Sequence, residues 1–273
     1  LKNHGDFTFG AFGDWRTGIQ EKWTSIDEFQ MSEVEKDEMW KEIRRIKKSN
    51  EEDRLQKQRK GAEEAERIWE SAELAESDHP YLVRKGVKSY GLKKVEYDGL
   101  EVLLVPLVDE FGKIWSFQRI YPDQRRADKI LLKNGRTSGL YFTIGDLSIQ
   151  RVVCEGYATG ASIHAATGYC VHVAFSAVNL REVAQTIRKL HSDVDLFIAA
   201  DDDYKTDGNP GLTKATEACR SSKAKIVIPV WSKDRGEKET DFNDLFKSER
   251  PQSIKNCFEK AGRPLEEKTD PQA

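Results

Sequence analysis

From residue 149 to residue 229, short apolar runs alternate with stretches that have a helical pattern. The strand-like runs cover residues 149–154, 170–175, 194–200 and 225–229. The helix-like stretches between them cover residues 157–167, 179–190 and 212–222. Strands that are apolar on both sides need a cover on both faces of their sheet, so this order predicts an α/β fold with a parallel sheet flanked by helices.

The chain before this sheet contains three different patterns. Residues 1–30 alternate phenylalanines with small or polar residues and predict the remnant of an N-terminal β-type segment. Residues 79–145 contain a hairpin pattern, with strands at 102–108 and 114–120 and a further strand at 140–144, and predict a smaller, basic α+β domain. Together with the rest of the chain, these patterns predict segments at 1–30, 31–78, 79–145, 146–250 and 251–273, the last being a C-terminal helix with a disordered tail.

Residues 31–78 form a highly charged stretch with no proline, in which acidic and basic residues are mixed. Its apolar residues are too sparse to bury a continuous stripe. We expect a solvated helical arm, either one long helix or a helical pair, anchored at its ends by Trp40 and Trp69. Both a linker and a partner-binding helix fit this pattern. The arm is expected to end before Pro80, because the residue before a proline avoids the α conformation.

Composition excludes several classes of protein. No apolar run approaches the roughly 20 residues that a membrane helix requires, so no membrane partner is expected. The 44 basic and 47 acidic residues give a net charge of −3, which does not by itself indicate a nucleic-acid-binding protein. The four cysteines, Cys154, Cys170, Cys219 and Cys257, form no CxxC pair, which predicts a cytoplasmic protein with neither disulfides nor a zinc site. The start at Leu1, without an initiator methionine or a signal-peptide pattern, indicates a fragment of a longer chain.

Acidic residues follow two of the predicted strands directly. Glu155 and Gly156 come after the first strand, and Asp201, Asp202 and Asp203 come after the third. Ligands of open α/β sheets collect at the carboxyl ends of the strands, and the glycine is expected to permit a sharp turn there. Asp201 and Asp203 point the same way along an extended chain, and paired carboxylates suit Mg²⁺ or Mn²⁺. The sequence therefore predicts a metal site, with a solvated, helix-capping acidic loop as the alternative.

A later acidic residue and a basic segment complete the candidate site. Asp241 is either a helix N-cap alone or an outer metal ligand. Between residues 80 and 145 basic residues outnumber acidic ones, which suits a polyanion held beside a metal. The residues expected to contact nucleic acid or nucleotide are Arg119, Lys129, Lys133 and Arg136, with Tyr121 stacking on a base. An ordinary solvated hairpin loop is the alternative.

The order of these motifs resembles the TOPRIM domain, which bacterial-type primases share with topoisomerases, certain nucleases and recombination proteins. A closer resemblance is to primases carried by phages, plasmids and other mobile genetic elements. The runs that carry it are GAFGDWRTG (10–18), HPYLVRKGV (79–87), LLVPLVDEFGKIWSFQRI (103–120), CEGYATGASIHAATG (154–168), VAFSAVNL (173–180), IAADDD (198–203), GNPGLTKA (208–215) and TDFNDL (240–245).

The resemblance implies a DNA primase catalytic region that acts in DNA replication. Such a nucleotidyltransferase joins ribonucleoside triphosphates into RNA primers on a single-stranded DNA template, with Mg²⁺ or Mn²⁺ as cofactor and a replicative helicase as a further partner. The family's conserved glutamate corresponds to Glu155, its DxD pair to Asp201 and Asp203, and its later acidic position to Asp241. Glu155 either shares a metal or transfers a proton. The alternatives are a TOPRIM metal-dependent nuclease, in which water replaces the 3′-hydroxyl, and a non-catalytic DNA-binding module.

Overall fold

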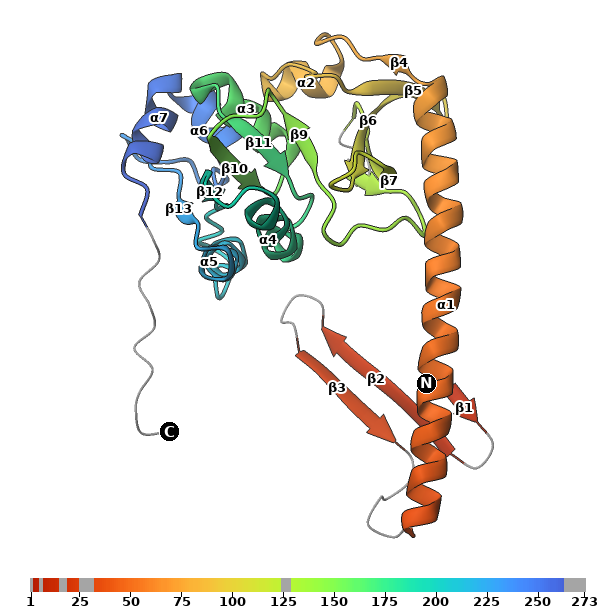
Figure 1. Ribbon diagram of the computed structural model, residues 1–273. Helices are drawn as coiled ribbons and strands as arrows, with labels where there is room; N and C mark the ends of the chain where they lie inside the picture. Colours follow the sequence, from red (N-terminus) through yellow and green to blue (C-terminus); the bar gives the residue numbers. More distant parts are fainter. Residues whose placement is uncertain (1, 5–6, 15–18, 25–31, 124–128, 263–273) are drawn as a thin grey trace, which may run out of the picture. The chain divides into compact units, whose positions relative to one another are not determined.

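The computed structural model describes residues 2–4, 7–14, 19–24, 32–123 and 129–262 (Figure 1). The chain divides into two compact units, residues 1–56 and residues 57–273. In the described parts, no helix combines the length and the apolar character that crossing a membrane requires.

The first unit contains a small antiparallel sheet and the beginning of a long helix. The sheet has the order β1-β2-β3, with strands at Lys2–His4, Phe7–Asp14 and Ile19–Thr24. Phe9 pairs with Thr24 across β2 and β3. The β-type segment predicted for this region is confirmed for its described residues.

The charged stretch forms one continuous helix, α1 (Glu33–Ser71), and not a helical pair. Ion pairs three or four residues apart, such as Lys41 with Asp37, lie along its exposed surface. The prediction that Trp40 anchors the helix is wrong, because this residue is 43% exposed. The buried residues of this part of the helix are Met39, Ile43 and Ile46, whose spacing places them on one face. Trp69, at the other end, does pack against a hydrophobic cluster.

The second unit begins with an antiparallel sheet of order β4-β5-β6-β7-β8. Its central strands β6 and β7 form the predicted hairpin, in which the carboxylate of Asp109 closes the turn by accepting hydrogen bonds from the backbone N–H groups of Phe111 and Lys113. The bounds are β4 (Glu73–Leu74), β5 (Lys93–Tyr97), β6 (Leu100–Val108), β7 (Ile114–Ile120) and β8 (Lys129–Leu131).

Between β4 and β5 lies a short helix, α2 (Pro80–Lys85), at the start of the segment predicted as a smaller α+β domain. Pro80 occupies the first turn, where its missing N–H costs nothing and its fixed φ suits the helix. Gly86 ends the helix with a φ of +67°, a left-handed conformation that glycine adopts without strain. The proline that was expected to stop one helix therefore begins another.

The remainder of the second unit is the predicted α/β layer. Its sheet has the order β13-β12-β10-β11-β9, parallel except for the edge strand β9. The strands are β9 (Phe142–Ile144), β10 (Gln150–Cys154), β11 (Cys170–Val173), β12 (Asp195–Ala199) and β13 (Lys225–Val227). The helices are α3 (Tyr157–Thr167), α4 (Leu180–Leu190) after a 3₁₀ turn (Ala177–Asn179), α5 (Pro210–Ser222), α6 (Phe242–Ser248) and α7 (Pro251–Glu259).

The two faces of this sheet carry different helices, as its strand pattern predicts. Val152 and Cys154 of β10 belong to the core that includes α3, α6 and α7, whereas Val153 belongs to the core that includes α4 and α5. Gly160 lets α3 approach closely, because a Cβ there would lie 3.0 Å from the Cys154 sulfur. The first core also includes Leu103 of β6, so both sheets of the second unit share it.

Candidate functional site

The acidic residues lie at the carboxyl ends of neighbouring parallel strands. Cys154 of β10 pairs with Ala199 of β12, which places Glu155 and the Asp201–Asp203 run at the same edge of the sheet. The backbone N–H of Asp202 donates to the carbonyl of Thr240 at 2.8 Å, and this bond brings the start of α6 to the same edge. The fold therefore places all four predicted acidic residues together.

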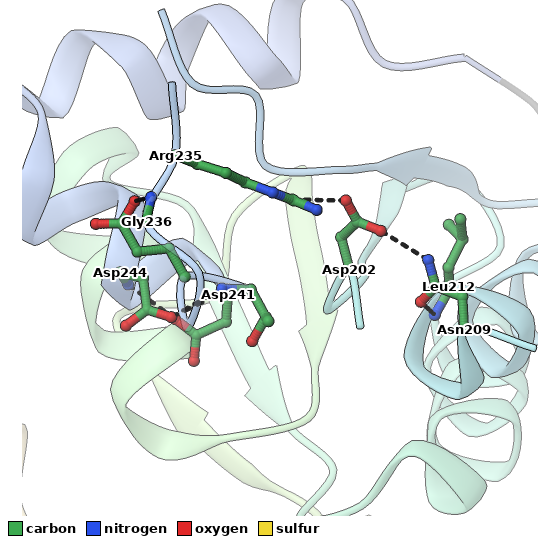
Figure 2. A network of polar contacts seen from close by, with 9 residues as sticks. Asp202, Asn209, Leu212, Arg235, Gly236, Asp241 and Asp244 are labelled. Carbon is green, nitrogen blue, oxygen red and sulfur yellow. Dashed lines mark hydrogen bonds and ion pairs between the residues drawn. The ribbon is translucent and has the colours of Figure 1, made fainter. Parts of the chain in front are cut away.

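Asp241 is the N-cap of α6. Its Oδ1 accepts a hydrogen bond from the backbone N–H of Asp244 at 2.8 Å, and Asp244 Oδ2 accepts in return from the backbone N–H of Asp241 at 3.4 Å. The same oxygen also accepts from the backbone N–H of Thr240 at 3.0 Å. Figure 2 shows Asp241 and Asp244 in this capping box. Asp241 Oδ2 also accepts a bond from the Thr159 hydroxyl of α3 at 3.1 Å. The N-cap role is thus confirmed, and the position of the carboxylate is determined by two helices.

Three carboxyl groups of this cluster, those of Glu155, Asp201 and Asp241, have a raised pKa. Burial raises the pKa of Asp201 well above the ordinary aspartate value, and the charges of Asp241, Glu155 and Asp203 raise it further while Lys129 opposes them. Burial also raises the pKa of Glu155, again with Asp203 adding to the effect and Lys129 opposing it. For Asp241, burial is the first cause of a raised pKa and Asp244 the second. The cluster therefore concentrates negative charge in a poorly solvated place.

The donor set of this cluster suits a hard divalent cation. Asp201 Oδ1 is buried without a hydrogen-bond partner in the described part of the chain, and a buried charge of this kind is costly unless it is paired. Across the described residues, however, no three His, Cys, Asp or Glu side chains converge closely enough to hold one ion as they stand. Asp203 Oδ2 accepts a hydrogen bond from Gly211 N–H at 3.3 Å. The residues fit a metal in chemistry, and the metal site stays a prediction.

Gly156 is not required for a sharp turn. Its φ of −107° and ψ of 152° are ordinary extended values that any residue adopts, and it serves as the N-cap of α3. A Cβ at this position would lie 3.6 Å from Thr159 Oγ1 and 3.9 Å from Lys129 Nζ, which is normal contact. The expectation of a special backbone conformation after Glu155 is therefore wrong. The short distance between Gly156 and Lys129 Nζ also shows that Lys129 lies beside the cluster.

Of the four predicted basic residues, Lys129 is the one whose charge acts on the carboxylates. Arg119 lies on β7, paired with Ile130 of β8, with its guanidinium carbon 4.4 Å from the centre of the Tyr97 ring. Arg136 lies 5.1 Å from the Trp115 ring and donates to a nearby carbonyl, and Lys133 is exposed after β8.

Two neighbours differ from the sequence interpretation. Tyr121 is buried, so it does not offer a free face to a base, whereas Tyr97, which contacts it edge-on, is exposed. Lys85 at the end of α2 opposes the rise in the pKa of Asp241, and it was not among the predicted site residues. Pro80, a typical first-turn residue, was the signal that could have placed Lys85 on a helix.

Asp202 has partners of its own. One of its oxygens accepts from Asn209 Nδ2 at 2.7 Å, and the other pairs with Arg235 Nη1 at 2.7 Å (Figure 2). The alternation of side chains along an extended chain predicts this separation from Asp201 and Asp203. The Gly208–Gly211 turn that leads into α5 is also engaged internally, because the N–H of Gly211 contacts Asp203.

Comparisons with known proteins identify a family domain and two homologous proteins. Residues 150–251 match the family model of the Toprim domain. Two DNA primase TraC proteins from Escherichia coli are homologous to the chain: one is 29% identical over 226 residues (80% of this chain, 21% of the relative), the other 30% identical over 166 residues (58% and 11%). The chain thus spans about a fifth or less of the length of these relatives.

Solved structures of primases share the fold. The DnaG primase catalytic domain bound to ssDNA matches with a TM-score of 0.53 at 11% identity, over 75% of this chain and 80% of that one. A structure of bacteriophage T7 lagging-strand DNA polymerase interacting with primase domains of two gp4 subunits matches with a TM-score of 0.50 at 16% identity, over 67% and 92%. At these identities the likeness concerns the fold alone.

Proposed function

We propose that this chain contains the catalytic region of a DNA primase, which joins ribonucleotides into RNA primers on a single-stranded DNA template. The Toprim domain and the homology to DNA primase TraC support this function. The observation that carries the proposal is the half-buried acidic cluster, in which Asp201 has a buried oxygen without a hydrogen-bond partner in the described part of the chain and the charges of three further carboxyl groups act on it.

The carboxylates that would hold Mg²⁺ are Glu155, Asp201 and Asp203, with Asp241 at the edge of the group. A bound divalent cation stabilises the negative charge that develops on the attacking and leaving oxygens during nucleotidyl transfer. The chain's own residues prepare this site in three ways. Gly211 N–H orients Asp203, the capping box orients Asp241, and Asp201 keeps a buried Oδ1 that no hydrogen bond occupies in the described part of the chain.

Basic and aromatic residues beside the cluster provide the nucleic-acid side of the proposal. Lys129 supplies a positive charge next to Glu155 and Asp201, where the phosphates of a ribonucleoside triphosphate must lie. Further along the antiparallel sheet, Arg119 lies over the exposed ring of Tyr97, a combination that suits the bases and phosphates of single-stranded DNA. Arg136 and Lys133 extend this basic surface in the proposal, and a replicative helicase is its expected protein partner.

The proposal is tested by measuring ribonucleotide incorporation on single-stranded DNA, with Mg²⁺ and Mn²⁺ in separate reactions. We expect Glu155→Gln and Asp201→Asn each to abolish incorporation while the protein stays folded. Asp195→Asn is the matched control: Asp195 lies at the opposite end of the β12 strand, where it pairs with Lys225. Incorporation that persists in both site variants would contradict the proposal. Cleavage of DNA without incorporation by the parent protein would instead favour a nuclease.

A further inference from the structure

We propose that the ion pair between Asp202 and Arg235 positions the metal-holding carboxylates on both sides of it, so that Arg235 is a positioning residue of the active site. This inference rests on the proposed function, because it assigns a role toward the same cation. Asp202 stands between Asp201 and Asp203 in the sequence, and Arg235 lies in the segment that joins β13 to α6.

The ion pair is better shielded from water than an ordinary surface pair. The side chains of Arg235 and Asp202 are 18% and 19% exposed, whereas those of Lys225 and Asp195 at the other end of the strands are 40% and 41% exposed. The guanidinium carbon of Arg235 lies 3.6 Å from the centre of the Tyr204 ring. Partial burial strengthens the attraction between the charges, and the ring limits the positions that the guanidinium can adopt.

One side of the pair controls the approach of Asp241. Asp202 is attached twice to the segment before α6: its carboxylate pairs with Arg235, and its backbone N–H donates to the carbonyl of Thr240. Thr240 directly precedes Asp241, whose carboxylate belongs to the cluster. A change at Arg235 therefore acts on Asp202, whose backbone bond to Thr240 brings Asp241 to the edge of the sheet.

The other side of the pair controls the turn that holds Asp203. The second oxygen of Asp202 accepts from Asn209 Nδ2 at 2.7 Å. Asn209 has a φ of +40° and caps α5, whose Gly211 N–H in turn contacts Asp203 Oδ2. Figure 2 shows the carboxylate of Asp202 between Arg235 and Asn209. One carboxylate thus links the two segments that present Asp241 and Asp203.

The experiment measures Mn²⁺ binding to metal-free protein by calorimetry, a readout independent of primer synthesis. Positioning predicts that Arg235→Gln weakens Mn²⁺ binding about tenfold, in line with the effect of residues that orient metal ligands. Simple electrostatics predicts the opposite sign, because removal of a positive charge beside an acidic site should strengthen the binding of a cation. Unchanged or tighter binding by Arg235→Gln therefore overturns the inference.

Further variants separate positioning from other effects. Asp202→Asn should weaken binding to the same extent, and the double variant no more than either single one, because both residues act through one pair. Arg235→Lys should recover part of the affinity, since it retains the charge but loses the planar geometry. Lys225→Gln is the control, because it removes the basic partner of Asp195 on the same sheet, and it should leave Mn²⁺ binding unchanged. A loss of Mn²⁺ affinity equal to that of Arg235→Gln would count against the inference.

A second measurement follows the backbone directly. Hydrogen exchange at the Asp202 amide, which donates to Thr240, should accelerate in Arg235→Gln and stay at the parent rate in Lys225→Gln. An unchanged rate in Arg235→Gln overturns the proposed coupling, as does a parent protein that binds no Mn²⁺. Intact Mn²⁺ binding without primer synthesis counts against the proposed function and leaves the positioning role standing.

Discussion

The hydroxyl of Tyr157 attaches the first helix of the Toprim layer to the chain that follows α2. Tyr157 is fully buried, and its Oη donates to the carbonyl oxygens of Lys88 at 2.7 Å and Ser89 at 2.6 Å. Substitution of Tyr157 by phenylalanine removes this group and keeps the ring in its place against Phe142. The substitution therefore isolates the contribution of one shared hydrogen bond.

The expected loss in the free energy of unfolding follows from the contribution of this hydrogen bond. A net hydrogen bond contributes about 0.5–1.5 kcal/mol, and leaving buried acceptors unpaired adds to that cost, so we expect a destabilisation of about 2 kcal/mol. For a unit of this size, each kcal/mol corresponds to about 2–4 °C in Tm, which gives a fall of about 4–8 °C. Lys88 is exposed, so water can satisfy part of the lost bond and larger losses are not expected.

The assay is thermal unfolding followed by calorimetry, with Tyr204→Phe as the matched control. This control removes the same atom from a tyrosine that is 42% exposed, and its Tm should stay within about 1 °C of the parent value. An unchanged Tm in Tyr157→Phe, or an equal fall in both variants, would refute the reasoning. A fall of more than about 12 °C would also contradict it, because it would exceed what one hydroxyl can contribute.

Two further predictions concern buried polar groups. The buried side-chain amide of Asn179 donates hydrogen bonds to the carbonyls of Leu140 and Ala174. We therefore expect Asn179→Ala to lower the free energy of unfolding by about 3–4 kcal/mol, as measured by urea denaturation. Burial raises the pKa of Glu155, Asp201 and Asp241, so the folded metal-free protein keeps protons that the unfolded chain releases above the ordinary values of 3.8 for Asp and 4.5 for Glu. Their contribution to the free energy of unfolding should therefore fall as pH rises above about 4. In EDTA, the urea midpoint of the parent protein should fall with rising pH, and it should fall less in the double variant Glu155→Gln/Asp201→Asn. An identical pH profile in the parent protein and the double variant would contradict this.

The sheet of the Toprim layer could be predicted because its sequence pattern is local. Its parallel strands are buried on both faces, so each appears as a short apolar run, and helix α3 was placed at residues 157–167 as observed. The position of the acidic residues followed from the same pattern, because a strand end and the carboxylate after it are adjacent in the sequence. Their use as metal ligands and the division of the chain into domains stay predictions.

Features that depend on tertiary contacts could not be predicted in this way. Trp40 was expected to anchor the arm because of its size, but the buried face of α1 is set by Met39 and Ile43. Tyr121 was expected to stack on a base, whereas its side chain lies inside the unit. Arg235 gains its partner from a strand end 33 residues earlier, and no sequence spacing indicates such a contact.

The edge strand β9 extends the parallel sheet beyond the matched Toprim segment. β9 runs antiparallel along β11 and satisfies the backbone groups on that side, yet its residues 142–144 precede the match, which begins at residue 150. At the far edge, Gly262 bridges to Ile226 of β13, again outside the match. A protein trimmed to residues 150–251 would expose the N–H and C=O groups of β11 that pair with β9, and the Ile226 N–H that donates to Gly262; exposed strand edges favour edge-to-edge aggregation. Recombinant versions of this layer should accordingly retain both flanking segments.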